Sequence, residues 1–399
     1  MKKWLIIAIV AILIIGFIGI SFKLGFFGPQ QGFKCDTKEG EWVPQQGECD
    51  SPEMKAKCDE FCEKHPNCCP GWEGRKGDIS VYYGLSWPSE KDIANLTRNY
   101  PETIKAINEG PNIYPKNFST NAVINNKTLE QMKETGFNTV QIMLIADENG
   151  SEIVFNDRNN IVLLHNIIAI KKYGLAAWIV IDSTGTHKTD LGTYEEFKKS
   201  FIDFVPLLSE LMEKYKVEYL TVNNEPDKPF KEQTTWGSQD QIEKNIEDFL
   251  PLTNAAAREK FKGKLINKIT LPRKHTSGVI EASFKNVDIA GVDVGPSMSA
   301  QMSHEIYKSE FDDYQFYATE AGKRNVSWMN AEYWQGDFQT EYGEFVKNNE
   351  LVYANISFNA YLAAIPKGVG YTWNEMAMFS LEPNGEKTKN AIKEFFNKI

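Results

Sequence analysis

Histidine is scarce in this sequence, and several glycine and serine motifs are missing from it. The 399-residue chain has five histidines, and no two of them are separated by a single residue. Metal-dependent barrel hydrolases bind their ions through clustered histidines, so we expect neither a metal site nor a cofactor. No glycine-rich phosphate loop and no Gly-x-Ser-x-Gly elbow is present, which argues against nucleotide-dependent chemistry and against a serine hydrolase.

Basic residues are outnumbered by acidic ones. The chain carries 44 Lys and Arg against 54 Asp and Glu, a net charge of −10. Nucleic-acid binding requires a basic face, so no nucleic-acid partner is expected. Hydrophobic residues make up 42% of the chain and charged residues 25%, values that exclude a disordered chain and a polytopic membrane protein.

The N-terminus carries one long apolar run. Residues 4–22 contain no charged side chain, and they lie between Lys2-Lys3 and Lys23. A helix of this length rises about 1.5 Å per residue and just spans a bilayer core of roughly 30 Å. No small-residue cleavage motif follows the run. We therefore predict that residues 1–23 form a transmembrane signal anchor that leaves the rest of the chain outside the cytoplasm. A cleaved signal peptide is the alternative.

Cysteine is confined to one short segment. An even, dense set of cysteines in an exported segment predicts a disulfide framework, here a small spacer over residues 24–77. A zinc site formed by Cys58, Cys62, His65 and either Cys68 or Cys69 is the alternative, although its spacing matches no common zinc signature. The six cysteines are Cys35, Cys49, Cys58, Cys62, Cys68 and Cys69.

Residues 78–399 alternate between short β-prone runs and longer segments of helical period. The predicted strands are 79–85, 139–145, 176–181, 219–223, 265–270, 287–294, 314–320 and 368–373. The predicted helices are 128–135, 160–173, 193–214, 239–260, 277–283, 298–311, 344–365 and 388–397. Eight strands, each followed by a helix, indicate a closed (β/α)8 barrel, a TIM barrel. A doubly wound open sheet is the alternative, but no dinucleotide-binding turn follows the first strand.

Two glutamates end strands of the predicted barrel. In such barrels the chemistry lies at the C-terminal ends of the strands. The fourth predicted strand runs into Asn224-Glu225-Pro226, and the seventh ends in Thr319-Glu320-Ala321-Gly322. Two facing carboxyl groups are what retaining glycoside hydrolysis requires, because one protonates the leaving oxygen and the other attacks the anomeric carbon.

These two motifs, with Trp373 on the eighth strand, resemble clan A of the retaining glycoside hydrolases over about residues 78–399. The resemblance implies that Glu225 is the general acid/base and Glu320 the nucleophile. It further implies that Asn224 binds the sugar 2-hydroxyl and that Trp373 forms the floor of the subsite for the reacting sugar.

The seventh strand can be assigned in a second way. Glu332 becomes the nucleophile if the strand is 327–332 and if 314–320 is helical, although the aromatic run before Glu320 is the more β-prone. Glu320 itself can instead be an ion-pair partner of Lys323 or Arg324. If 314–320 is the strand, Glu332 lies in the loop that follows and can still reach substrate.

The sequence also departs from the clan A pattern. Many members carry an arginine on strand two that supports the nucleophile, whereas residues 139–145 contain none, and no aromatic residue ends the sixth strand. Arg324, Tyr333 or His187 can supply the missing support, and Tyr333 and His187 are also predicted to bind substrate. The departures leave open a catalytically inactive glycan-binding protein, and the same covalent intermediate also permits a transglycosylase.

Tryptophans are expected around the mouth of the barrel. Sugar rings stack their C–H faces on aromatic planes, so such a rim suits a glycan, although each tryptophan can instead pack a loop onto the barrel. The four candidates are Trp87, Trp236, Trp334 and Trp373. Asp227 can likewise bind a hydroxyl or cap a helix. The sequence as a whole predicts a membrane-anchored, extracytoplasmic hydrolase of β-linked oligo- or polysaccharides.

Overall fold

The computed structural model describes most of the chain from residue 88 onward and three short pieces before it. The described ranges are 57–58, 60–61, 64–65, 88–109, 124, 126–145, 147–149, 152–154, 157–182, 191–295, 303–333, 350–374 and 383–399. The predicted anchor, the predicted strand 79–85 and all the cysteines except Cys58 lie outside these ranges. Within them, no helix combines the length and apolar character needed to cross a bilayer. The anchor and the disulfide spacer therefore stay predictions.

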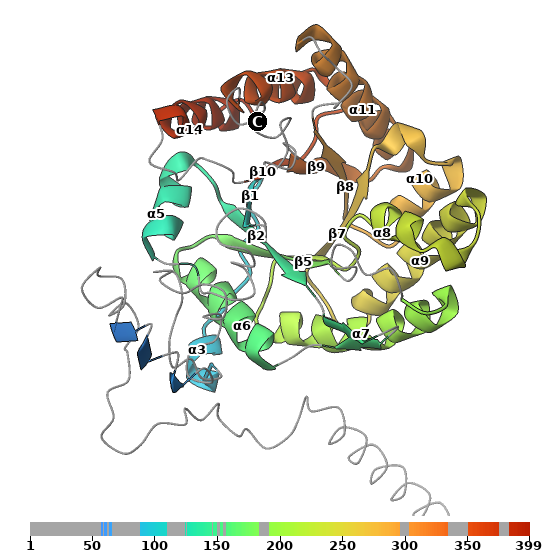
Figure 1. Ribbon diagram of the computed structural model, residues 1–399. Coiled ribbons are helices and arrows are strands. Elements are labelled where there is room, and N and C mark those ends of the chain that lie inside the picture. Colours follow the sequence, from blue (N-terminus) through green and yellow to red (C-terminus); the bar gives the residue numbers. More distant parts are fainter. Residues whose placement is uncertain are drawn as a thin grey trace, which may run out of the picture.

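Eight parallel strands close into a barrel, which confirms the predicted fold class (Figure 1). Around the barrel the strand order is β1-β10-β9-β8-β7-β6-β5-β2. The strands are β1 (Ile104–Glu109), β2 (Thr139–Ile145), β5 (Ala176–Asp182), β6 (Tyr219–Thr221), β7 (Lys264–Thr270), β8 (Ile289–Val294), β9 (Ser327–Tyr333) and β10 (Gly370–Asn374). In barrel order β6 is therefore the fourth strand, β7 the fifth, β8 the sixth and β9 the seventh.

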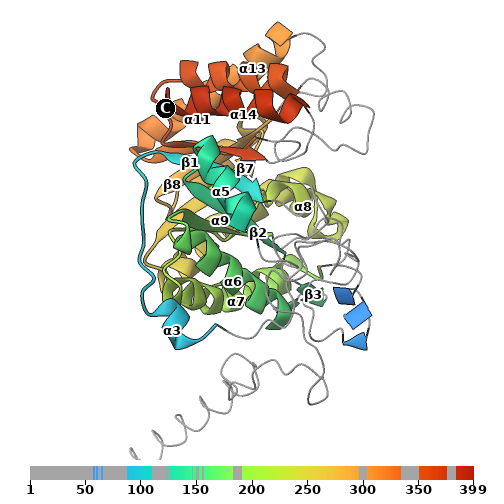
Figure 2. The same ribbon diagram turned by 90° about the vertical axis from the view of Figure 1, so that its left-hand side faces the viewer.

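Helices surround the barrel, and shorter elements lie near its ends. The helices between strands and after the last one are α5 (Asn126–Thr135), α6 (Asp157–Lys172), α7 (Tyr194–Lys214), α9 (Gln239–Arg258), α10 (Ser277–Ser283), α11 (Ser303–Arg324), α13 (Glu350–Ala363) and α14 (Pro383–Phe396). The shorter elements are α3 (Glu90–Ile93), α8 (Asp227–Glu232), the 3-10 turns Thr234–Trp236 and Pro272–Lys274, and the hairpin β3 (Asp147–Asn149) and β4 (Glu152–Val154). Figure 2 shows β3 and α8 at one end of the barrel and the segment from α3 to β1 along the other.

The first barrel strand is not the predicted one. It is Ile104–Glu109, which lies between the predicted strand 79–85 and the predicted helix 128–135, where the sequence predicts neither a strand nor a helix. The strand is short, but its side chains alternate as a barrel strand requires. Ile104 and Ala106 join the apolar cluster inside the barrel, whereas Ile107 joins the layer under the helices.

The seventh strand also differs from the preferred prediction. Residues 314–320 belong to α11, and β9 is the next segment, Ser327–Tyr333. The aromatic run in 314–320 is β-prone, but its buried positions repeat every three or four residues, which is the period of a helix face. The buried residues of α11 are Ile306, Glu310, Asp313, Tyr314, Tyr317, Ala318 and Ala321.

The N-terminal end of the barrel is closed by the segment that leads into β1. Glu218, just before β6, accepts hydrogen bonds from the backbone N–H of Asn99 at 2.8 Å and of Ala177 at 2.9 Å. The ammonium group of Lys171 lies 2.6 Å from the same carboxylate, and both side chains are buried. These contacts fix the end of the barrel that is remote from the C-terminal ends of the strands.

Candidate active site

A β-bulge turns Glu332 toward the inside of the barrel. Val292 of β8 pairs with Asn330 of β9, but the next residue, Asp293, pairs with Glu332, so Ala331 is an extra residue on β9. A bulge of this kind reverses the alternation of side chains beyond it. It therefore gives Glu332 the interior position that a regular strand would have given only to Ala331.

Lys268 is the partner of Glu332 across the interior. The Lys268 Nζ lies 2.6 Å from Oε2 of Glu332 and 3.3 Å from Oδ2 of Asp293. The lysine side chain is fully buried. Burial opposes the charge on Lys268, but the acidic groups around it, Asp293, Glu332 and Glu225, outweigh it and raise the pKa of the lysine. Lys268 is therefore a permanent positive charge inside the barrel.

Asp293 is the third carboxyl group of the interior. It is one strand away from Lys268 and pairs in register with Glu332. Burial raises the pKa of Asp293 well above its ordinary value, and the carboxylates of Glu225 and Glu332 add to this effect, whereas Lys268 opposes it. Asp293 therefore favours its neutral, protonated form, and Lys268 is left to balance the charge of Glu332.

Glu225 follows the fourth barrel strand in an unusual backbone conformation. Its φ is +43°, a left-handed value that is costly for a residue with a side chain and is typical of functional sites. Glu225 acts electrostatically on both Lys268 and Asp293, which places its carboxyl group at the same interior cluster. The preceding Asn224 bridges to Lys268 through the backbone, and its Oδ1 has no hydrogen-bond partner among the described residues.

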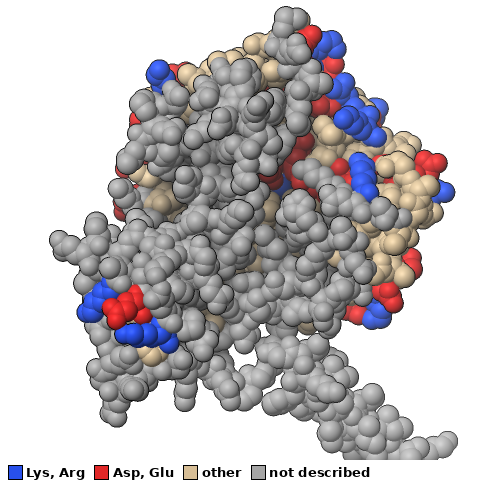
Figure 3. Space-filling model, viewed as in Figure 1, with Lys and Arg blue, Asp and Glu red and all other residues tan. Residues whose placement is uncertain are grey.

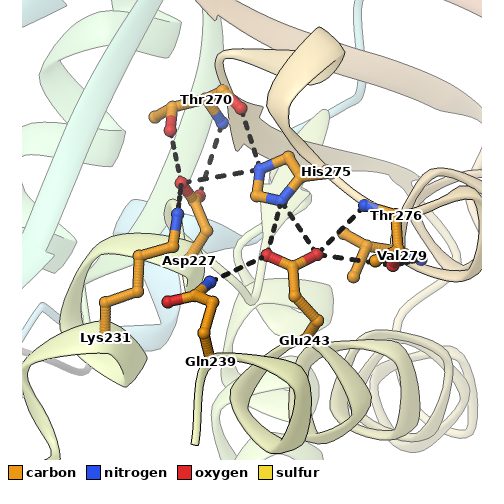
Figure 4. A network of polar contacts seen from close by, with 8 residues as sticks. All are labelled: Asp227, Lys231, Gln239, Glu243, Thr270, His275, Thr276 and Val279. Atoms are coloured by element: carbon orange, nitrogen blue, oxygen red, sulfur yellow. Dashed lines mark hydrogen bonds and ion pairs between the residues drawn. The ribbon is translucent and has the colours of Figure 1, made fainter.

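A second polar network holds the segment that carries Glu225 (Figure 4). Asp227, at the start of α8, accepts hydrogen bonds from the backbone N–H and the hydroxyl of Thr270 at the end of β7. The Nε2 atom of His275 lies 3.6 Å from Asp227 and 3.0 Å from the carbonyl oxygen of Thr270, and its Nδ1 atom lies 3.3 Å from Glu243 of α9. The network links the loop after β6 to the strand of Lys268.

The network is charged as well as hydrogen-bonded. Burial opposes the positive charge on His275, but the hydrogen bond and the charge of Asp227 outweigh it and raise the pKa of the imidazole. Burial likewise opposes ionisation of Asp227, but His275 and Thr270 lower its pKa. The carboxylate of Asp227 therefore ties the start of α8 to Thr270 and His275. It does not cap that helix, because the N-cap residue is Pro226 and no side chain caps it, so the helix-cap role that the sequence allows is wrong.

The charged cluster faces the C-terminal end of the barrel. Figure 3, viewed as Figure 1, shows acidic atoms near the centre of this face. The strands contribute apolar residues deeper in the interior, among them Trp178, Tyr219 and Met329. The arrangement brings two carboxyl groups, Glu225 and Glu332, to the surroundings of one buried cation. No group of His, Cys, Asp and Glu in the described ranges is arranged to hold a metal ion.

Glu320, the preferred candidate for the nucleophile, lies on the outer shell. It is on α11, with Nζ of Lys323 2.5 Å and Nη1 of Arg324 2.6 Å from its carboxylate oxygens. Hydrogen bonds from these two residues lower the pKa of Glu320. The assignment of Glu320 to the end of a barrel strand is therefore wrong, and the ion-pair alternative describes its surroundings. Arg324 pairs with Glu281 in addition, so it is not the support of the nucleophile either.

Trp373 and Tyr333 lie in the layer between the barrel and the helices. Their rings stack on each other with centroids 5.3 Å apart, and Trp373 also packs on Phe358 of α13. The Tyr333 hydroxyl donates to the backbone carbonyl of Tyr353 at 3.2 Å. Trp373 shares a face of β10 with Tyr371, whose hydroxyl contacts Ser357 of α13. The predictions that Trp373 is a subsite floor and that Tyr333 binds substrate are not compatible with these positions.

Trp236 is part of a buried aromatic cluster. Its indole N–H donates to the carbonyl oxygen of Gly192 at 2.8 Å, and its ring packs on Phe197 and Phe230 with centroids 5.4 and 4.9 Å away. Only 5% of the residue is exposed, so it packs its loop onto the barrel and presents no face to a sugar. Trp87, Trp334 and His187 lie outside the described residues, and their predicted roles stay untested.

Sequence reasoning missed Lys268 and Asp293. Both lie on predicted strands, and both share a face with apolar residues two positions earlier: Ile266 before Lys268, and Gly291 before Asp293. A lysine on the inner face of a buried strand is costly unless a carboxylate meets it. The position of Lys268 on the inner face of an apolar strand was therefore the available signal, because it predicts an acidic partner inside the barrel.

Comparisons with known proteins bear on the fold. No family model and no curated protein matches the sequence. Among solved structures, a family 5 xyloglucanase from Paenibacillus pabuli is similar with a TM-score of 0.53 at 11% identity, covering 74% of this chain and 99% of that one. A GH5-4 broad-specificity endoglucanase from an uncultured bacterium gives a TM-score of 0.54 at 10% identity, covering 74% and 94%. A GH113 beta-1,4-mannanase gives 0.50 at 12%, covering 74% and 99%. The chain thus shares its barrel fold with these glycoside hydrolases.

Proposed function

We propose that this protein is a retaining glycoside hydrolase that cleaves β-linked oligo- or polysaccharides, with Glu332 as nucleophile and Glu225 as general acid/base. The observation that carries the proposal is the position of Glu332 at the end of the seventh barrel strand, 2.6 Å from a buried lysine that keeps it in its ionised form. Glu225 follows the fourth strand and faces the same cluster. A double displacement uses two carboxyl groups at one site, and this cluster offers such a pair.

The reaction takes two steps. In the first, a carboxylate oxygen of Glu332 attacks the anomeric carbon, and the bond to the leaving oxygen breaks while Glu225 gives that oxygen its proton. In the second, Glu225 takes a proton from water, whose oxygen attacks the anomeric carbon and releases Glu332 from the ester. Two inversions give net retention.

The proposed substrate class is supported by the resemblance to clan A and by the structural neighbours. They include a xyloglucanase, a broad-specificity endoglucanase and a beta-1,4-mannanase, so a β-1,4-linked backbone is the substrate to try first. The Oδ1 of Asn224, which has no hydrogen-bond partner among the described residues, supports a hydrogen bond to a sugar hydroxyl. The uncharged run 4–22 supports a membrane-anchored enzyme that acts outside the cytoplasm.

The test is hydrolysis of β-1,4-glucan, xyloglucan and β-1,4-mannan, with the first-formed anomer observed by proton NMR. Release of the β-anomer supports the proposal, and release of the α-anomer contradicts a retaining mechanism. Azide separates the two carboxyl groups. Glu225→Ala with azide should yield a β-glycosyl azide, whereas Glu332→Ala should yield the α-glycosyl azide. Binding of these glycans without any hydrolysis would instead support an inactive glycan-binding protein.

A further inference from the structure

The positive charge beside Glu332 comes from β7, whereas the clan A pattern predicts an arginine on strand two. Strand β2 places Gln141 inside the barrel where an arginine is expected on that strand, and its amide donates to the carbonyl oxygen of Ala331 at 3.2 Å. Gln141 thus holds the backbone of the bulge and brings no charge. The positive charge is brought by Lys268 of β7, which reaches past β8 to Glu332.

We propose that Lys268 is a positioning residue that serves as the counter-charge of Glu332 and Glu225 in turn, so that the charge of the cluster stays constant through both steps. The inference rests on the proposed function and adds a positioning residue to its site. Lys268 is fully buried and 2.6 Å from Glu332, and its backbone pairs with that of Asn224, the residue before Glu225.

The charge balance explains why one lysine is enough. Before the reaction Lys268 is positive, Glu332 is negative and Glu225 is protonated, so the three groups sum to zero. When Glu332 becomes an ester it loses its charge, and in the same step Glu225 gives up its proton and becomes negative. The sum is again zero. A buried cation with no remaining counter-charge is costly, so the negative charge that Glu225 acquires in the first step takes the place of the charge of Glu332 beside Lys268.

Asp293 does not compete with Glu332 and Glu225 as the counter-charge of Lys268. The groups that face Lys268 within the described part of the chain are Asp293 from β8, Glu332 from β9 and Glu225 after β6. Because burial and its two acidic neighbours favour the protonated form of Asp293, it does not take the charge of Lys268 for itself. Asp293 at 3.3 Å is also the more distant of the two ion-pair partners.

The test compares Lys268→Met with Lys171→Met. Lys171 forms an ion pair of the same 2.6 Å length with Glu218, also buried, at the other end of the barrel. If Lys268 acts as proposed, Lys268→Met moves both limbs of the pH profile of kcat/KM to higher pH by one unit or more, because both carboxyl groups ionise less readily. It also slows turnover at least tenfold with aryl glycosides of good and of poor leaving groups, since both steps are affected. Lys171→Met lowers stability and leaves the profile in place.

Two further variants keep the test decisive. Lys268→Arg keeps the charge and should keep the profile at its wild-type position. If Lys268→Met does not fold, Lys268→Met/Asp293→Asn removes the lysine together with one of the acidic groups, and the same shift is expected. An unchanged pH profile, or a rate loss confined to substrates with poor leaving groups, would overturn the proposal.

One readout does not depend on turnover. The carboxyl carbon of Glu332 can be followed by NMR in protein labelled with [5-13C]glutamate and assigned by its loss in Glu332→Gln. Its titration midpoint should move to higher pH by at least one unit in Lys268→Met and should not move in Lys171→Met. A wild-type protein that cleaves no β-glycoside would refute the proposed function, whereas an unmoved midpoint would refute the role of Lys268.

Discussion

The ammonium group of Lys268 and the carboxylate of Glu332 are 2.6 Å apart although their strands are not neighbours in the sheet. The contact passes in front of β8, whose Asp293 lies 3.3 Å from the same ammonium group. It exists because a bulge at Ala331 turns Glu332 inward. This pair defines the centre of the candidate site and identifies which of two glutamates near the seventh strand faces the interior.

Replacing Glu332 and Glu320 by glutamine should have opposite consequences. Glu332→Gln removes the attacking carboxylate, and we expect a loss of kcat/KM of at least about a thousandfold. Glu320→Gln should keep activity within about threefold and cost less than about 1 kcal/mol of stability, since partly exposed ion pairs contribute little. Steady-state kinetics and urea unfolding of the two variants measure both effects. A thousandfold loss in Glu320→Gln would place the chemistry on α11 and contradict the site described above.

Glu310 should make the protein less stable as pH rises. It is fully buried on α11, and burial raises its pKa to about 8, while the Ser357 and Tyr333 hydroxyls oppose that rise. A carboxyl group with a raised pKa gives its full stabilisation below the unfolded pKa of about 4.5. That stabilisation is lost as pH rises toward 8, at up to about 1.4 kcal/mol per pH unit.

Glu310→Gln should remove this pH dependence. We expect the variant to unfold at a higher urea concentration than the wild-type protein at pH 8 and to lose that advantage at pH 5. Glu386→Gln is the matched control, because Glu386 is an exposed helical glutamate. Parallel curves of stability against pH for wild type and Glu310→Gln would show that the buried carboxyl group does not carry the effect.

His275 should contribute to the stability of the fold mainly at acidic pH. Its pKa is raised, so the stabilisation it brings is fully present below the unfolded value of about 6.5 and is lost as pH rises through the folded value. His275→Gln should therefore lower the melting temperature most at pH values below about 6.5, and the difference should shrink at higher pH. Calorimetry over this range measures it. His304→Gln, at an exposed position, is the control. An equal loss of melting temperature in both variants would refute the claim that the charge of His275 stabilises the network.

Much of the fold could be read from the sequence because the buried parallel strands are short, apolar and β-rich. The strand predicted at 139–145 and the helix predicted at 277–283 have the observed bounds. The first strand could not be found in this way, since Ile104–Glu109 contains a lysine, an asparagine and a glutamate among its six residues. The seventh was misplaced because local β-propensity in 314–320 conflicts with the helical period of its buried residues, and tertiary packing follows the period.

The candidate site was only partly predictable for a related reason. Glu225 and Asn224 could be proposed from the sequence because a strand end and a short motif coincide, and their roles stay predictions. The inward turn of Glu332 depends on one extra residue in β9, and nothing in the local sequence shows such a bulge. The roles of Trp373 and Trp236 depend on which face of a strand or loop meets a helix, which a single sequence does not reveal.

The central claim is that Glu332 is the nucleophile of a retaining glycosidase. The most direct test is incubation of the protein with 2-fluoro-glycoside inactivators of the β-gluco and β-manno series, followed by intact mass measurement and peptide mapping. The account predicts a single glycosyl adduct on Glu332. An adduct on Glu320, or on any other residue of the folded protein, would contradict it.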